Sequence, residues 1–330
     1  MSNLERFARF ARFVIPAVLL VAGSGAFAQT RTHGIDVSSN QGTMNWNTAY
    51  NQNVRFAFVR ATRGPSSGPQ SLNDSQFSTN VTNLRNLAVS QNKVIYNGFY
   101  HYGRPDVIAI NDGNNGIDDA GFNATNSQPT LSAITTSAQD EADHFWSVVG
   151  SHYSIGGVDV SRRLPPVLDV EERGGDSGQD PDADALTPAN LTLWVDTFIN
   201  RFVELSGGVR PILYMNTNYA TNFVTSSLAD ETLWVANWSM PTQSQTGNPG
   251  DGVFPTWAFW QYDSPNGLGT AYGAQAPPLA SPDMDLDVAN GDINFVRSFL
   301  VPEPGSMTLA MAAIALFATS RPRRRAASST

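Results

Sequence analysis

The chain has 330 residues, enough to bury a large core in one barrel-sized domain or in two smaller ones. Hydrophobic residues make up 41% and charged residues only 15%, which is typical of a folded, loop-rich, secreted protein rather than a highly charged cytosolic one. The net charge is −9 although arginines cluster at both ends, so the acidic body argues against a nucleic-acid partner, and the absence of cysteine excludes disulfides and thiolate metal sites.

The first 28 residues match the pattern of a secretory signal peptide. Arginines precede the apolar run at 13–22, and Ala26-Phe27-Ala28 fits the rule for small residues at a cleavage site. We therefore expect cleavage after Ala28 and export, with residues 29–300 forming the folded body.

The body contains eight short apolar segments that are typical of buried strands. They span residues 34–37, 54–61, 94–102, 165–171, 210–215, 232–238, 256–262 and 284–288. Helical segments separate the early strands, whereas the last three strands leave little room for helices between them. This order predicts an α/β fold, an irregular TIM-like (β/α) barrel with eight strands and few helices between the last ones.

Three segments have the spacing of amphipathic helices: residues 72–90, 137–149 and 188–206. The third is the best defined, because Thr187 can cap its first turn and Gly207-Gly208 ends it.

Three other stretches predict loops. Residues 104–136 are rich in Asn, Asp, Gly and Thr and indicate a long insertion beside the third strand. Residues 241–255 and 263–282 are rich in Pro, Gly and Ser and are expected to connect strands.

Two acids, Asp169 and Glu171, end the fourth predicted strand with one residue between them. Side chains alternate faces along a strand, so both carboxyls point the same way, with Cα atoms about 6.5–7 Å apart. Each disfavours ionisation of the other, so we expect one pKa to be raised. Cleavage of a glycosidic bond needs such a protonated carboxyl beside an ionised one, although an ordinary acidic strand end would carry the same residues.

The C-terminal segment, residues 301–330, combines three features. Val301-Pro302-Glu303-Pro304 is followed by the apolar run 307–318 and then by a cluster of arginines. The run is short for a stable membrane span of about 20 residues, and the basic cluster after it favours transient insertion with its end in the cytoplasm.

A series of motifs then appears along the body in one order. They are Gly34-Ile-Asp-Val-Ser-Ser-Asn-Gln-Gly42, Phe56-Ala-Phe-Val-Arg-Ala-Thr-Arg-Gly64, Gly98-Phe-Tyr-His-Tyr-Gly-Arg-Pro105, Pro166-Val-Leu-Asp-Val-Glu171, Leu213-Tyr-Met-Asn216, Leu233-Trp-Val-Ala-Asn-Trp238, Trp260-Gln-Tyr262 and Asp285-Leu-Asp-Val288. With this set, the body from about His33 to Asp292 resembles the muramidases of glycoside hydrolase family 25, the Chalaropsis-type lysozymes.

The resemblance implies a (β/α) barrel that acts as a secreted 1,4-β-N-acetylmuramidase, hydrolysing the bond between N-acetylmuramic acid and N-acetylglucosamine in peptidoglycan. Glu171 matches the family's general acid, and Asp169 matches the partner that orients or stabilises the acetamido group of the substrate. Asp36 and Asp285 match two other acids of the pocket. All four are expected at or near the C-terminal ends of strands, where barrel enzymes carry their sites. The spacing leaves open whether the reaction inverts or retains the anomeric configuration.

Aromatic rings near strand ends are candidates for substrate binding, because flat rings suit the apolar faces of sugars. Aromatic residues also fill cores, so we expect about half of the candidates to be core residues. The candidates are Tyr100, Tyr102, Tyr214, Trp238 and Trp260. His101 lies one position off the tyrosine face, and we expect a structural role for it.

Arg63 departs from the family pattern, because members commonly have Glu at this position. A cation near Glu171 would lower the pKa of that carboxyl and make it a poorer acid, so the pH optimum or the substrate could differ. Arg63 and the insertion keep two alternatives open. One is a non-catalytic glycan-binding protein, and the other is a hydrolase of another amino-sugar-containing extracellular polysaccharide.

The C-terminal segment separately resembles a PEP-CTERM sorting signal. That resemblance implies export across the inner membrane of a Gram-negative-type cell, processing by a sorting protease near Pro302–Pro304, and association with extracellular polysaccharide. The expected location is therefore periplasmic, at the cell surface or extracellular. We expect a monomer without metal or cofactor, because the histidines show no ligand spacing and acidic clusters such as Asp180–Asp184 are typical of solvated loops.

Overall fold

The computed structural model describes residues 30–68, 70–105, 129–154, 162–171, 186–275 and 282–301. The predicted signal peptide at 1–28 and the sorting segment beyond Val301 lie outside these ranges. So do most of the expected insertion at 104–136 and the acidic stretch Asp180–Asp184.

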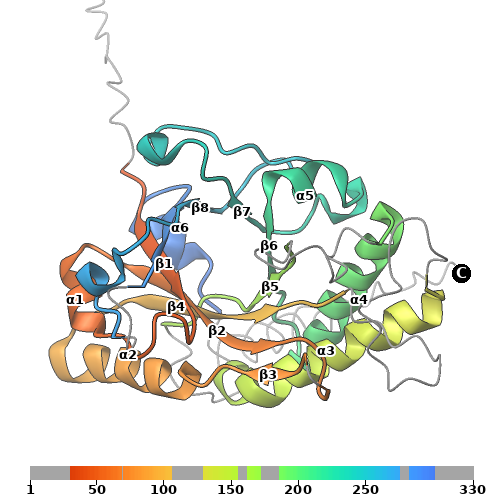
Figure 1. The fold of residues 1–330 in the computed structure, drawn as a ribbon, viewed down its shortest axis with the longest axis horizontal. Coiled ribbons are helices and arrows are strands. Elements are labelled where there is room, and N and C mark those ends of the chain that lie inside the picture. The colour runs from red at the N-terminus through yellow and green to blue at the C-terminus, as the bar shows by residue number, and fades with distance from the viewer. Residues whose placement is uncertain are drawn as a thin grey trace, which may run out of the picture.

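Eight strands close into a barrel, as predicted (Figure 1). They are β1 (His33–Val37), β2 (Phe56–Arg63), β4 (Tyr96–Tyr102), β5 (Val167–Asp169), β6 (Ile212–Asn216), β7 (Leu233–Ala236), β8 (Phe259–Asp263) and β9 (Asp285–Ala289). Neighbouring strands are parallel from β1 through β2 and β4 to β8, and β9 closes the barrel antiparallel to both β8 and β1. Antiparallel neighbours need no helical crossover, which explains why β9 follows β8 without a long helix.

Helices cover the outside of the barrel. They are α1 (Trp46–Asn51), α2 (Phe77–Gln91), α3 (Leu131–Tyr153), α4 (Pro188–Ser206), α5 (Thr217–Asn222) and α6 (Ile293–Ser298), with 3₁₀ turns η3 (Ser226–Leu228), η4 (Pro241–Gln243) and η5 (Gly269–Tyr272). The prediction for α4 is confirmed at both ends. The Thr187 side chain accepts a hydrogen bond from the Asn190 N–H, and Gly207 adopts the left-handed conformation with φ 72°.

Two helix predictions need correction at their ends. The segment expected as a helix from residue 72 first forms the short strand β3 (Leu72–Asn73), which pairs antiparallel with the end of β2. Asp74 then turns the chain into α2 by accepting a hydrogen bond from the Gln76 N–H. In turn, α3 begins at Leu131, capped by Thr130, so the last residues of the expected insertion are helical.

Large apolar side chains fill the lower part of the barrel. Phe56, Phe58, Trp234 and Phe259 point inward and contact one another, with ring centroids of Phe58 and Trp234 4.5 Å apart. Gly34 leaves room for them, because a Cβ on this residue would lie 2.3 Å from the Phe56 ring. The polar side chains at the C-terminal ends of the parallel strands therefore lie next to this apolar layer.

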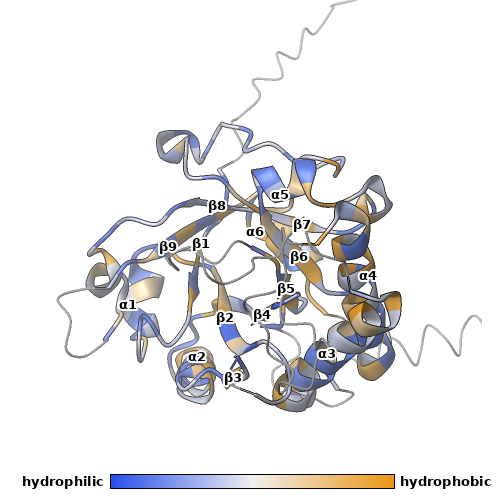
Figure 2. Ribbon diagram, turned by 45° about the vertical axis from the view of Figure 1, so that its right-hand side comes forward, coloured by the Kyte–Doolittle hydropathy of each residue, from blue (hydrophilic) through white to orange (hydrophobic). Residues whose placement is uncertain are grey.

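A second apolar layer lies between the strands and the helices. Figure 1 shows α3 and α4 side by side, and Figure 2 shows hydrophobic residues along the strands and on these helices. Phe145 on α3 packs against Phe198 and Phe202 on α4. In the described part of the chain, no helix has both the length and the apolar character to cross a membrane.

Candidate active site

The barrel brings the four predicted acids to one cavity. Asp36 near the end of β1 and Asp169 at the end of β5 point into it, and Glu171 follows two residues after Asp169 on the same face. Asp285 is the first residue of β9, so the expectation that all four acids end strands is wrong there. Because β9 runs antiparallel to its neighbours, its beginning lies at the same mouth as their C-terminal ends.

The cavity has a volume of about 760 Å³ and is lined by polar and aromatic side chains. This volume lies within the range of roughly 300–1,000 Å³ that is usual for ligand pockets. Asp36 and Asp285 are directly paired in the register of β1 and β9, so their Cβ atoms lie about 4.5–5.5 Å apart. Two negative charges at this distance repel each other, and the charge of Asp285 therefore raises the pKa of Asp36.

The pKa of Glu171 is raised into the range where a carboxyl can act as a general acid near neutral pH. Burial and the charge of Asp285 raise the pKa of Glu171 to about 7, while a hydrogen bond from Tyr214 and the charge of Arg60 oppose the rise. The Tyr214 hydroxyl lies 3.5 Å from Glu171 Oε2. A carboxyl with this pKa is still partly protonated near neutral pH and can donate a proton there.

The neighbouring aspartates are shifted in the same direction. Burial raises the pKa of Asp169 well above its usual range, the charge of Glu171 adds to the rise, and Arg60 opposes it. Burial and the charges of Asp285 and Asp287 likewise raise the pKa of Asp36. Within the described residues, Asp169 Oδ1 is buried without a hydrogen bond, which is consistent with a desolvated carboxyl.

Gln261 joins several of these groups, and the sequence analysis did not assign it a role. Its Nε2 donates to Asp36 Oδ2 at 2.8 Å. Its Oε1 accepts from the Tyr214 hydroxyl at 2.9 Å and from the Trp238 indole N–H at 3.0 Å. The signal that could have found it is alternation on β8, which turns Gln261 to the same inner face as Phe259.

Asp287 lies beneath the cavity and was also missed as a candidate. It is fully buried, and the Trp234 indole N–H donates to its Oδ1 at 3.0 Å. Burial and the charge of Asp285 raise the pKa of Asp287 well above its usual range. Its position two residues after Asp285 on β9 was the available signal, because both side chains then face the barrel interior.

Arg60 is a cation that acts on the acids, and the sequence analysis did not assign it this role. Arg60 lowers the pKa of both Asp169 and Glu171, and it is held by Asp74 at 2.9 Å and by the Ser39 hydroxyl at 3.0 Å. Arg63 lines the same cavity. A cation near Glu171 does lower the pKa of that carboxyl, as expected, but burial outweighs the effect and the pKa is raised to about 7.

Four of the five aromatic candidates line the cavity. Tyr100 and Tyr214 form part of its wall and are largely buried, whereas Trp238 is 55% exposed at the rim. Tyr102 lines it as well. Trp260 does not, and this prediction is corrected. It lies on the outer face of β8, fully buried, with its indole N–H donating to the Asn237 carbonyl at 2.9 Å.

His101 points away from the cavity, on the outer face of β4. Burial lowers the pKa of His101 to about 3, so the ring is neutral. Its Nε2 lies 2.8 Å from Glu141 Oε2, and its Nδ1 lies 2.7 Å from the Thr62 hydroxyl. Because the ring is neutral, its contact with Glu141 is a hydrogen bond rather than an ion pair, and it fixes α3 against the barrel.

Clustered carboxyls with raised pKa values at the mouth of a (β/α) barrel are typical of a barrel hydrolase that works by acid–base chemistry. Residues 35–132 and 128–269 match the family model described as glycosyl hydrolases family 25. Since these matches span more than half of the chain, it belongs to glycosyl hydrolase family 25 and is a glycoside hydrolase.

Individual relatives are distant in sequence. The chain is 27% identical over 262 residues to lysozyme M1 of Streptomyces globisporus, covering 78% of this chain and 67% of that protein. It is 25% identical to an N,O-diacetylmuramidase of Arthroderma benhamiae, covering 73% of this chain and 82% of the relative. The crystal structure of a bacterial lysozyme from Streptomyces coelicolor matches with a TM-score of 0.54 and 24% identity, covering 82% of this chain and 97% of that one, which supports the fold alone.

Proposed function

We propose that this chain is a secreted 1,4-β-N-acetylmuramidase that hydrolyses the bond between N-acetylmuramic acid and N-acetylglucosamine in peptidoglycan. Membership of family 25 and similarity to a lysozyme and an N,O-diacetylmuramidase support this substrate. The observation that carries the mechanism is Glu171, whose pKa is raised to about 7 inside a cavity that also holds Asp169.

Glu171 is the general acid of this proposal. It gives its proton to the glycosidic oxygen while the bond between that oxygen and the anomeric carbon breaks. A water molecule adds its oxygen to the anomeric carbon, and its surplus proton passes to the carboxylates of the cavity. Burial raises the pKa of Glu171 and so keeps the proton on the acid at the pH where the reaction runs.

The three aspartates assist in different ways. Asp169 orients or stabilises the acetamido group of the sugar, since it lies on the same face as Glu171. Asp285 acts on Glu171 by charge, because it is the largest electrostatic contribution to the raised pKa of that residue. Asp36 is held by Gln261 and offers an oxygen at the same mouth.

The aromatic residues at the mouth bind sugar rings in this proposal. Trp238 is the strongest candidate, because it is exposed and its indole N–H is fixed by Gln261. Tyr100, Tyr102 and Tyr214 complete the wall. This arrangement offers the substrate both aromatic rings and carboxyls within one cavity.

We also propose export and sorting, on the strength of the sequence patterns alone. Residues 1–28 act as a signal peptide, and residues 301–330 act as a PEP-CTERM segment processed near Pro302–Pro304 after transient insertion in the membrane. Intact-mass measurement of the protein recovered from its native host tests both. A product beginning at Gln29 and ending near residue 302 is expected, and an unprocessed chain would overturn the proposal.

Digestion of purified peptidoglycan by the full chain tests the catalytic proposal. Mass spectrometry reads the new reducing ends for the unmodified chain, for Glu171→Gln and for Glu204→Gln, a control that replaces an exposed carboxylate on α4. We expect products that end in N-acetylmuramic acid, lost by a factor of about 10²–10⁴ only in Glu171→Gln.

Three outcomes would contradict the proposal in different ways. Cleavage that survives Glu171→Gln would remove Glu171 as the acid. Binding without cleavage by the unmodified chain would contradict the proposed catalysis. If the chain does not cleave peptidoglycan but cleaves another amino-sugar polymer, that polymer and not peptidoglycan is the substrate.

A further inference from the structure

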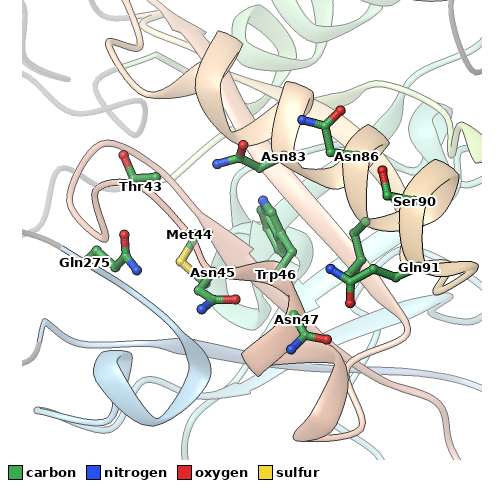
Figure 3. Close-up of a pocket in the computed structure, with 11 residues that line it drawn as sticks. Thr43, Met44, Asn45, Trp46, Asn47, Asn83, Asn86, Ser90, Gln91 and Gln275 are labelled. Atoms are coloured by element: carbon green, nitrogen blue, oxygen red, sulfur yellow. The ribbon is translucent and has the colours of Figure 1, made fainter.

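A second cavity lies outside the barrel, between α1 and α2. Its volume is about 390 Å³, and it shares no lining residue with the catalytic cavity. Figure 3 shows the side chains of α2 on one side and Thr43, Asn45 and Gln275 on the other, with Trp46 between them. We refer to it as the amide groove.

The walls of the amide groove are largely polar and carry no charged side chain. None of its lining side chains is acidic or basic, although the chain as a whole has a net charge of −9. Six of them are carboxamides: Asn45, Asn47, Asn83, Asn86, Gln91 and Gln275. A carboxamide offers both a donor and an acceptor, which matches the hydroxyl and acetamido groups of a neutral sugar, whereas no lining side chain supplies a countercharge to an ionic ligand.

Several of these amides are available to a ligand. Within the described residues, the side chains of Asn83, Asn86, Gln91 and Gln275 make no hydrogen bond with another protein group, while Asn45 caps α1 and Asn47 accepts from Lys93. The available groups come from α2 and from the segment after η5, so separate elements line the groove (Figure 3).

The floor of the groove is rigid. Asn80 is fully buried and holds the β1–α1 loop at two points and the first residue of α1 at a third. Its Oδ1 accepts from the Met44 N–H at 2.8 Å, its Nδ2 donates to the Gly42 carbonyl at 3.1 Å, and its carbonyl accepts from the Trp46 indole N–H at 3.0 Å. Because this floor is already formed, binding of a ligand does not have to include the free-energy cost of ordering it.

The same loop separates the groove from the catalytic cavity. Asn40 lines the catalytic cavity and Thr43 lines the groove, and three residues span at most roughly 10 Å. Gln41, between them, is buried and donates to the Asp283 carbonyl at 3.1 Å, which fixes the loop. A polymer bound in the groove is therefore held near the catalytic mouth, where its effective concentration rises.

We propose that the amide groove is a second, non-catalytic binding site for a neutral oligosaccharide, such as an uncharged run of N-acetylhexosamine units. Binding there does not require turnover. The advantage of binding at this site is that it would hold a glycan strand close to the catalytic acids, and only this advantage rests on the proposed function.

Fluorine NMR of the full chain labelled with 5-fluorotryptophan tests the site, in a Glu171→Gln background that prevents turnover. Trp46 reports on the groove and Trp238 on the catalytic cavity, and their signals are assigned from the two Trp→Phe variants. The probe is triacetylchitotriose, a neutral trimer of N-acetylglucosamine. We expect a saturable shift of the Trp46 signal, and no shift of that signal with trigalacturonic acid, an anionic oligosaccharide.

The variant Asn83→Ala with Asn86→Ala removes two available amides from α2, and alanine keeps the helix stable. We expect the apparent affinity read at Trp46 to fall about tenfold, because two hydrogen bonds are lost, while the response of Trp238 persists. Thr82→Ala, an exposed position of α2 outside the groove, is the matched control and should change neither. A Trp46 signal that ignores the trimer, or a shift that survives the double variant, would overturn the site. A missing Trp238 response alone would instead count against the proposed function.

Discussion

The side chain of Gln261 donates to Asp36 across a distance of 2.8 Å, although the two residues lie on strands β8 and β1, which are separated by β9. The same amide accepts from Tyr214, next to Glu171, and from Trp238 at the rim. One neutral group therefore connects an acid of the cavity, the neighbour of the proposed general acid and the exposed aromatic ring at the rim. Such networks lose more than one contact when their central member is removed.

Replacing Gln261 by Leu should lower kcat/KM about 10- to 100-fold, because Asp36 loses the hydrogen bond that Gln261 donates and two donors, the Tyr214 hydroxyl and the Trp238 indole N–H, lose their acceptor. The pH profile separates positioning from simple loss of packing. Gln261→Glu keeps the acceptor but places a second carboxyl against Asp36, so its activity should recover partly at low pH, where the new carboxyl is protonated.

Gln52→Leu, at an exposed position after α1, serves as the control and should leave kcat/KM unchanged. Equal losses in Gln261→Leu and Gln261→Glu at every pH would indicate that the network does not act on the acids.

The raised pKa of Glu171 fixes the alkaline side of the pH profile. A general acid works only while protonated, so kcat/KM should fall as the pH rises through about 7. The hydrogen bond from Tyr214 lowers the pKa of Glu171, so Tyr214→Phe should move this alkaline limb to higher pH. Steady-state rates at constant ionic strength measure the shift, with Tyr50→Phe outside the cavity as the control.

A limb that stays in place in Tyr214→Phe, or moves to lower pH, would show that this hydroxyl does not stabilise the ionised acid. The height of the profile is a weaker test, because Tyr214 also donates to Gln261.

Periodicity predicted the regular parts of the fold well. The helix at 188–206 was found with its cap at Thr187 and its end at Gly207, because both ends carry local signals. The short helix α5 (Thr217–Asn222) has only six residues, too few for a periodic pattern to be visible. The short strand β3 was missed for a related reason, since two residues in register with β2 have no sequence signature.

The site was harder to predict, because the sequence does not show which residues of different strands come close together in the folded barrel. Asp169 and Glu171 could be placed on one face by alternation, which is a local property. The side chain of Gln261 meets Asp36, 225 positions away in sequence, only after the barrel closes. Trp260 was misassigned because a strand-end aromatic can face either side, and in the structure it lies on the outer face of β8 while its neighbour Gln261 lines the cavity.

Trp238 and Trp260 form a matched pair that tests this assignment. Trp238→Ala removes an exposed ring from the rim and should raise KM about tenfold, which corresponds to about 1.4 kcal/mol, while stability changes by less than about 0.5 kcal/mol. Trp260→Ala empties a fully buried site and should cost about 3–5 kcal/mol of unfolding free energy.

Steady-state kinetics and urea unfolding measure the two effects separately. If Trp260→Ala raises KM without lowering the free energy of unfolding, Trp260 belongs to the binding site and its position in the outer layer is contradicted.

The buried carboxyl of Glu171 should also make stability depend on pH. Its pKa rises from an ordinary value of 4.5 to about 7 in the folded chain, so the folded state holds a proton that the unfolded state has already lost. Stability is therefore fully present below about pH 4.5 and is lost as the pH rises toward 7, by roughly 3 kcal/mol at most for this group. Glu171→Gln cannot ionise, so its unfolding free energy should fall less steeply over that range and exceed that of the unmodified chain at pH 8. Urea unfolding at several pH values measures both slopes, and parallel curves would mean that Glu171 ionises in the folded protein as easily as in water.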